Sequence, residues 1–177
     1  MCIRDRLLSV WAYDAGVRLA GLGLVLLAAW LLRYDLARRN VRLSGLTRFI
    51  AVCLFGGYVW LAAGGLLWMV YGGVMAGPIY DAVLHAVFLG FVFAMIFGHA
   101  PLIFPAVLGR PMAYLPAFYG PLIVLHLSLA LRLVGDLFDV VPLRQWGGLL
   151  NGVALLLFLG LTALALARGA PARHVDA

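Results

Sequence analysis

Five apolar stretches of about 20 residues each make up most of this chain and restrict its fold more than any other feature. A helix needs about 20 mostly apolar residues to cross the hydrocarbon core of a bilayer. Inside that core, backbone N–H and C=O groups must be hydrogen-bonded within the protein, so helices are the expected form. The sequence therefore predicts an all-α integral membrane protein, a bundle of about five transmembrane helices. The expected spans are 15–32, 49–71, 80–108, 116–134 and 146–167.

The composition supports a membrane protein and argues against the soluble classes. Hydrophobic residues make up 66% of the 177 residues, and the mean hydropathy is +1.07. Soluble domains are about 45–50% apolar. The formal charge of +6 comes from arginines that lie mostly in loops between the apolar spans. The membrane explains this placement, so the bilayer is the expected partner and nucleic acid is not.

The domain organisation is simple. A single transmembrane domain is expected over residues 15–168, between an N-terminal segment at 1–14 and a polar tail at 169–177. The opening Met-Cys-Ile-Arg-Asp-Arg resembles translated sequencing-adapter sequence. We therefore expect residues 1–6 to be non-native and the chain to be the tail of a longer protein. The third span contains Pro101 and Pro105, and one kinked helix is favoured there over a helix that ends near Ala100 and continues as a re-entrant segment.

The distribution of arginine predicts the orientation in the membrane. Arg33, Arg38, Arg39, Arg42 and Arg48 lie between the first two spans, and the same side receives Arg110, Arg168 and Arg173. Loops rich in arginine stay in the cytoplasm. The sequence therefore predicts a multi-pass protein of the bacterial inner (cytoplasmic) membrane, with the 33–48 loop and the C-terminus in the cytoplasm.

Three histidines inside the spans are the candidates for chemistry, because ionisable residues in a membrane are costly. His85 and His99 are fourteen residues apart on the third span. On a continuous α-helix they would share a face, about 40° short of four full turns and about 21 Å apart. This spacing resembles the haem-ligand pairs of membrane b-type cytochromes. The alternative is that each ring hydrogen-bonds a backbone carbonyl or a hydroxyl group across helices.

His126 lies on the fourth span, at a depth similar to that of His99 on the antiparallel third span. A metal ion or a haem bridged between these two rings is one hypothesis, because neutral imidazole is the commonest metal ligand. An interhelical hydrogen bond is the other. His174 is expected to be solvated in the polar tail.

Two charged residues are candidates for a supporting role. Asp81 precedes His85 by four residues, so its carboxylate is placed to receive the ring N–H and fix the tautomer. The alternatives for Asp81 are an interfacial salt bridge or a charge at a helix N-terminus. Arg132 is four residues from Asp136, where a surface ion pair and a haem-propionate contact are both open.

Several short motifs resemble the C-terminal part of the NnrS family. They are the run from Asp81 to Gly90 with its His85-Ala86 pair, the Gly109-Arg110-Pro111 segment, the Gly57-Tyr58-Val-Trp60 segment and the Leu129-Ala-Leu-Arg132 segment. NnrS proteins are larger membrane proteins that contain haem and copper and are tied to nitric oxide metabolism. The resemblance implies haem b and/or copper bound at His85. One departure is Val107, which stands where the family usually has a histidine.

Three functions remain open. The first is an NnrS-like protein that binds haem or metal through His85, His99 and His126, with Asp81 and Arg132 in support, in nitric oxide or redox metabolism. The second is a cofactor-free membrane scaffold or subunit. The third is a fragment of a small-solute transporter, with the proline-containing third span as a discontinuous helix. Further helices from the same or another chain, or a homo-oligomer, are the expected protein partners. The sequence has no Ser-His-Asp, P-loop or paired-carboxylate pattern, so it assigns no enzymatic reaction.

Overall fold

A computed structural model of the chain describes residues 13–169. Residues 1–6, which we expect to be non-native, lie outside the described residues, as do His174 and most of the polar tail. Within 13–169 the chain is helical and contains no strand. Five helices are long and apolar enough to cross a membrane. The prediction of an all-α, multi-pass membrane protein is confirmed.

The helices extend slightly beyond the spans predicted from the sequence. The first is α2 (Tyr13–Tyr34), followed by the short α3 (Ala37–Asn40) and by α4 (Gly45–Tyr71). The third span consists of three consecutive segments, α5 (Pro78–His85), the π-helix η1 (Ala86–Val92) and α6 (Phe93–Leu108). The short 3-10 helix η2 (Pro116–Phe118) leads into α7 (Tyr119–Leu137), and α8 (Val141–Arg168) is the last.

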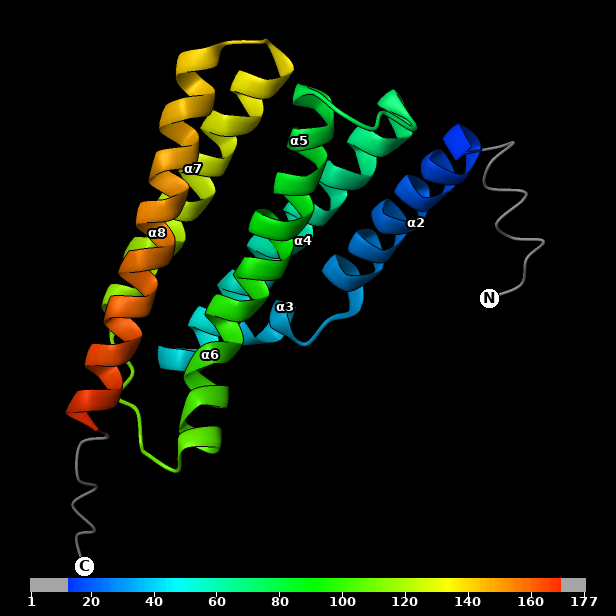
Figure 1. Cartoon of the computed structure of the whole chain (residues 1–177). Helices are drawn as coiled ribbons and strands as arrows, with labels where there is room; N and C mark the ends of the chain where they lie inside the picture. Colours follow the sequence, from blue (N-terminus) through cyan, green and yellow to red (C-terminus); the bar gives the residue numbers. More distant parts are fainter. Residues whose placement is uncertain (1–12, 170–177) are drawn as a thin grey trace, which may run out of the picture.

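The helices form a row rather than a ring (Figure 1). Helix α2 lies at one edge and packs on α4, and the antiparallel pair α7 and α8 forms the other edge. Between them, the third span packs along α4, and its α5 part also contacts α7. The outer faces expose large apolar side chains such as Leu19, Trp30 and Leu156. An apolar surface of this extent requires lipid as its solvent.

The third span passes through both prolines without ending. Helix α6 includes Pro101 and Pro105 and stops at Gly109, whose φ of 63° is the left-handed conformation that glycine adopts readily. The structure thus has a single helix here, as the favoured interpretation expected, and not a re-entrant segment.

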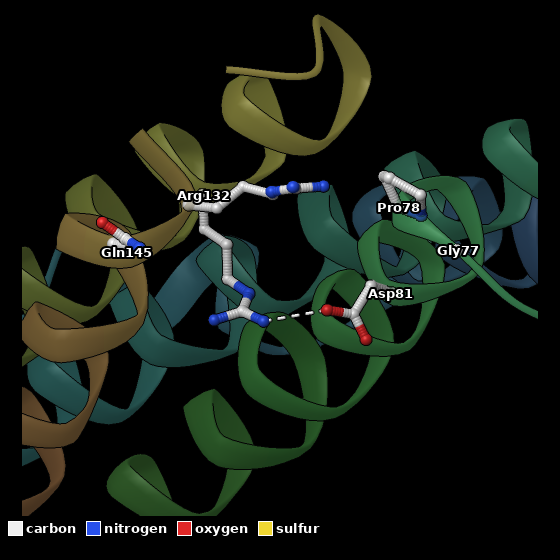
Figure 2. A pocket seen from close by; sticks show the side chains of 6 residues that line it. Gly77, Pro78, Asp81, Arg132 and Gln145 are labelled. Atoms are coloured by element: carbon white, nitrogen blue, oxygen red, sulfur yellow. Dashed lines mark hydrogen bonds and ion pairs between the residues drawn. The ribbon is translucent and has the colours of Figure 1, made fainter. Parts of the chain in front are cut away.

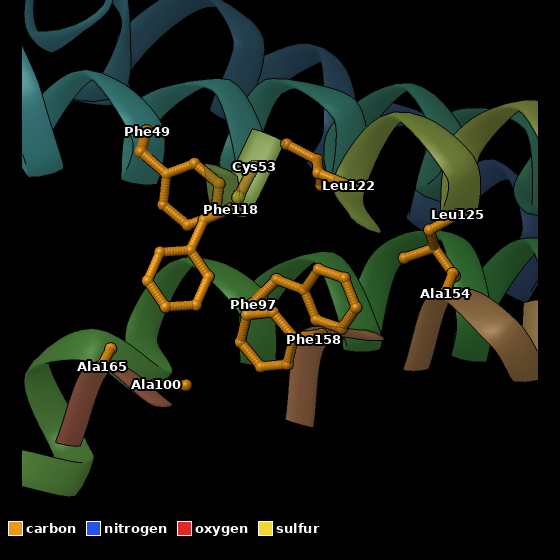
Figure 3. Close-up of a cluster of buried hydrophobic side chains, with 10 residues drawn as sticks. All are labelled: Phe49, Cys53, Phe97, Ala100, Phe118, Leu122, Leu125, Ala154, Phe158 and Ala165. Atoms are coloured by element: carbon orange, nitrogen blue, oxygen red, sulfur yellow. The ribbon is translucent and has the colours of Figure 1, made fainter. Parts of the chain in front are cut away.

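The main hydrophobic core lies toward the end of the bundle where α4 begins and α8 ends (Figure 3). Phe97 of α6 stacks on Phe158 of α8, with ring centroids 3.8 Å apart and an interplanar angle of 7°. Phe49 and Cys53 of α4 are fully buried in the same cluster. Cys53 is therefore a small core residue.

At the opposite end, two residues of α2 cap the C-terminus of α4. Arg18 donates to the carbonyl oxygens of Met69 and Val70 at 2.6 and 3.0 Å, and it pairs with Asp14 at 2.7 Å. Asp14 also accepts the backbone N–H of Gly73. The last carbonyls of a helix have no partner within the helix and attract positive charge. The ion pair therefore holds α2 and α4 in register.

Candidate functional site

A strip of small residues on the third span faces α4 and sets the direction of the two histidines beside it. Ala86 packs near Gly64, Gly90 against Trp60, and Gly98 against Cys53. In an α-helix, residues spaced by four overshoot a full turn by about 40°. The π-helix η1 has i→i+5 hydrogen bonds and therefore more residues per turn. Each residue of η1 rotates the chain less than in an α-helix. This smaller rotation offsets the overshoot, and the small residues stay against α4. These small residues therefore have a structural role, because they let the third span and α4 approach each other closely.

His85 and His99 lie on opposite flanks of this strip. His85 immediately precedes Ala86, and His99 immediately follows Gly98, and each step along a helix turns the chain by about 100°. The flank of His85 is the one toward α7 and α8, because Phe97, which likewise precedes a strip residue, stacks on α8. The expectation that the two rings share a face is wrong. A shared face requires a regular α-helix from His85 to His99, and the π-helix η1 between them changes the register.

Both rings make the same hydrogen bond within their own helix. Nδ1 of His85 lies 2.7 Å from the carbonyl oxygen of Asp81, and Nδ1 of His99 lies 2.8 Å from that of Met95. A carbonyl oxygen only accepts, so Nδ1 carries the proton in each ring. In the neutral ring Nε2 is then left with a bare lone pair. Metal-binding histidines have this arrangement, with the second nitrogen donating to a carbonyl or a carboxylate.

His126 is held differently. Trp60 of α4 donates its indole N–H to Nδ1 of His126 at 2.9 Å, and the two rings are nearly parallel. A neutral ring that accepts at Nδ1 carries its proton on Nε2. Nε2 is buried and has no hydrogen-bond partner among residues 13–169. It lies above Gly56, where a Cβ atom would be only 2.5 Å away.

The structure does not bring His99 and His126 together. His126 faces α4, whereas His99 lies on the flank of α6 opposite to Phe97, which stacks on α8. Across the described residues, no group of three or more His, Cys or Asp side chains has the geometry to hold a metal ion. The hypothesis of a site bridged between these two rings therefore has no support from their positions. Equal depth on neighbouring helices does not determine direction.

Asp81 and Arg132 form an ion pair between α5 and α7. Their side chains approach to 2.9 Å (Figure 2). The carboxylate of Asp81 is thus bound to Arg132, and the carbonyl of Asp81, not its carboxylate, accepts from His85. The expected carboxylate–histidine contact is absent, and the alternative of a salt bridge is the one that the structure has.

Asp136 lies behind this ion pair and is the most buried charged residue of the group. Its side chain is 0% exposed, with Arg132 at 3.9 Å and Arg144 of α8 at 3.8 Å. Neither carboxylate oxygen has a hydrogen-bond partner within the described chain. Arg132 lies directly over Gly147 and Gly148, which let α8 approach α7 closely. The expected surface pair between Arg132 and Asp136 is therefore a buried, loosely spaced contact.

An open cleft of about 450 Å³ lies on the outer side of this network (Figure 2). Its polar lining comes from Asp81, Arg132, Arg144 and Gln145, and its floor from Gly77 and Pro78 at the start of α5. Sequence reasoning identified Asp81 and Arg132 but missed Arg144. The only signal for Arg144 was its place in the short loop region after the fourth span.

Two polar pairs inside the bundle join neighbouring helices. The Trp60–His126 bond is the interhelical hydrogen bond that the sequence left open for His126, although its partner was not predicted. The second pair, which sequence reasoning missed, joins Ser128 of α7 to Asn151 of α8 at 2.6 Å. Asn151 is 3% exposed, and its amide nitrogen has no partner in the region that the structure describes. Polar side chains at corresponding depths of neighbouring spans were the available signal.

Comparison with known proteins places the chain in a family without assigning it a function. The family described as a domain of unknown function, DUF8744, matches residues 2–167. No curated protein and no solved structure matches the chain. Because the matched region covers almost the whole sequence, the chain belongs to the DUF8744 family.

Proposed function

We propose that this protein binds haem b or copper in the membrane through histidine Nε2 atoms, in a redox or nitric oxide-related process like that of the NnrS proteins it resembles. The observation that carries the proposal is the pair of Nδ1–carbonyl hydrogen bonds at His85 and His99. Each bond orients its ring and leaves the other nitrogen ready to coordinate. A histidine in a membrane span also has a high cost unless it has a partner.

Each of the two histidines can supply one ligand to a haem or metal, and residues 13–169 do not complete the coordination of either centre. His85 and His99 lie on opposite flanks, so they would serve separate centres, each with its remaining ligand from further helices of a longer chain or from another chain. Haem or copper supplies one-electron chemistry and binding of diatomic gases when it is held by such rings. His126 offers no free lone pair while it accepts from Trp60. We therefore assign His126 a role in holding α4 against α7.

The proposal includes the location of the protein in the cell. Arg33, Arg38, Arg39, Arg42 and Arg48 lie at the end of the bundle that also carries Arg110 and Arg168. By the arginine rule this end faces the cytoplasm of a bacterial inner membrane. His85 then lies nearer the outer leaflet, and His99 nearer the inner one.

An oxidised-minus-reduced absorption spectrum of the full chain, purified from cells supplied with haem, tests the proposal together with iron and copper analysis. We expect a Soret band that weakens in His85→Ala and in His99→Ala. His126→Gln is the matched control, because glutamine keeps an acceptor for Trp60 and removes an imidazole. Its spectrum is expected to equal that of the wild type. A folded, colourless and metal-free preparation would contradict the proposal.

A cofactor-free scaffold is the second candidate, and cross-helix polar pairs favour it. The Trp60–His126, Ser128–Asn151 and Asp81–Arg132 bonds each join two different helices. In this function the described histidines stabilise the bundle and coordinate nothing. The metal-free result above, combined with loss of stability in His126→Phe, which removes the acceptor for Trp60, would select it. The transporter alternative lacks such an observation, since the cavity that borders Ala100 and Phe104 is lined by apolar residues only.

A further inference from the structure

A basic cleft lies at the end of the bundle where α2 turns into α4. It has a volume of about 580 Å³, and its charged lining consists of Arg33, Arg38, Arg39, Arg42 and Asp35. Four arginines and one aspartate give the lining a formal charge of +3. Nothing in the proposed haem or metal chemistry uses these residues.

The single carboxylate in the cleft is held by two neutral donors and forms no salt bridge with the arginines. One oxygen of Asp35 accepts the backbone N–H of Ala37 at 2.7 Å, and the other accepts the hydroxyl of Tyr58 at 3.0 Å. The bond to Ala37 fixes the turn between α2 and α3, and the bond to Tyr58 anchors this turn to α4. Throughout residues 13–169, no carboxylate forms a salt bridge with any of the four arginines of the cleft.

Four guanidinium groups around one hollow repel each other unless an anion lies between them. Guanidinium matches phosphate through two parallel N–H···O bonds, and it is the preferred group for binding phosphate. The fixed turn holds the arginines around a cleft instead of leaving them spread along a flexible loop. An anion with phosphate geometry is therefore the ligand class that the site fits.

The apolar surroundings indicate the source of that phosphate. Tyr34 and Leu36 also line the cleft and are 68% and 70% exposed, and Trp30, one turn earlier on α2, is 59% exposed. Trp30 and Tyr34 form an aromatic pair with centroids 6.1 Å apart. Exposed aromatic and leucine side chains at the end of a membrane helix lie at the level of lipid headgroups. Clusters of arginine immediately beyond a membrane helix attract anionic lipids.

We propose that this cleft binds the phosphate headgroup of an anionic phospholipid, with the acyl chains lying along the exposed face of α2 at Trp30. The charge of +3 favours a headgroup with two phosphates over a headgroup with one. The site is separate from His85, His99 and the Arg132 network, and it does not depend on haem or metal binding.

Native mass spectrometry of the full chain in detergent tests the proposal with cardiolipin, phosphatidylglycerol, phosphatidylcholine and inorganic phosphate as probes. We expect affinity to fall from cardiolipin to phosphatidylglycerol, with phosphatidylcholine weakest, and inorganic phosphate to compete poorly. The triple variant Arg38→Gln, Arg39→Gln, Arg42→Gln is expected to lose at least about 10-fold in affinity for cardiolipin, because it removes three of the four guanidinium groups that line the cleft.

The matched control is the triple variant Arg48→Gln, Arg110→Gln, Arg168→Gln. It removes the same charge from exposed arginines at the same end of the bundle, outside the cleft. Its cardiolipin affinity is expected to change by less than about 3-fold. Equal losses in both triple variants would overturn the proposal in favour of diffuse attraction. If inorganic phosphate competes as well as the lipids do, the cleft is a site for free phosphate and the lipid proposal is overturned. If the protein shows no preference for anionic lipids over phosphatidylcholine, the proposal of an anion site is overturned.

Discussion

Trp60 of α4 and His126 of α7 share a hydrogen bond of 2.9 Å in the middle of the bundle, with their rings nearly parallel. Helices α4 and α7 otherwise touch at few points. This bond therefore connects the α2–α4 edge of the row to the α7–α8 edge. It also determines which nitrogen of His126 carries the proton.

Replacing Trp60 by phenylalanine removes the donor and leaves both nitrogens of His126 without a partner. We expect the free energy of unfolding to fall by about 1–2 kcal/mol, near the upper end of measured interhelical hydrogen bonds. Titration with a denaturing detergent measures it. The double-mutant cycle with His126→Phe isolates the bond, with an expected coupling of about 0.6–1.7 kcal/mol. A coupling near zero would show that the bond contributes nothing.

Gly56 provides the space that His126 occupies. An added methyl group would lie 2.5 Å from Nε2 and 2.8 Å from Cε1 of the ring. Gly56→Ala should displace the ring, weaken the bond to Trp60 and reduce stability by about 1–3 kcal/mol. Gly120→Ala on α7 is the control, because nothing lies within 4 Å of its added Cβ. There, alanine should leave stability equal or raise it by up to about 1 kcal/mol. The same detergent titration compares the two variants, and equal effects would contradict the steric explanation.

Arg132 is expected to be the most sensitive charged position in the chain. Arg132→Met removes the hydrogen bond to Asp81 and one of the two cations beside the fully buried side chain of Asp136. An uncompensated buried charge costs about 3–5 kcal/mol, so we expect a loss of about 3 kcal/mol or more, or failure to fold. The second substitution Asp136→Asn removes that charge and should restore most of the stability or the yield of folded protein. If the double variant is no better than the single one, the charge of Asp136 is not the cause.

We expect the protein to lose stability at high pH because of Tyr114, which lies in the loop between α6 and η2. Burial, and then the neighbouring Tyr119, raise the pKa of Tyr114 above its ordinary value. A raised pKa in the folded state contributes stability that is complete below the unfolded pKa of about 10 and is lost as the pH rises toward the folded pKa. Melting temperatures should therefore fall above about pH 10. In Tyr114→Phe the decline should be shallower, and an identical profile would contradict the assignment.

Sequence reasoning predicted the class of the fold and the number of membrane helices, because both depend on local properties. About 20 apolar residues cross a bilayer as a helix whatever their neighbours are. The helix that continues through Pro101 and Pro105 was likewise the interpretation that the sequence favoured. The candidate site was predicted less well. The three histidines were identified as residues inside spans, but their directions and partners were not.

The sequence by itself determined the five helices, because hydrophobicity and length are sufficient to place a helix in lipid. Only the tertiary structure decided where the polar side chains point. The π-helix η1 places His85 and His99 on opposite flanks, and contact with Trp60 defines the state of His126. The carboxylate of Asp81 pairs with Arg132 and not with His85, because α7 brings the guanidinium group of Arg132 to within 2.9 Å of it. The partners of His126 and Asp81 are 66 and 51 positions away in the chain, and helical periodicity holds no information about such contacts.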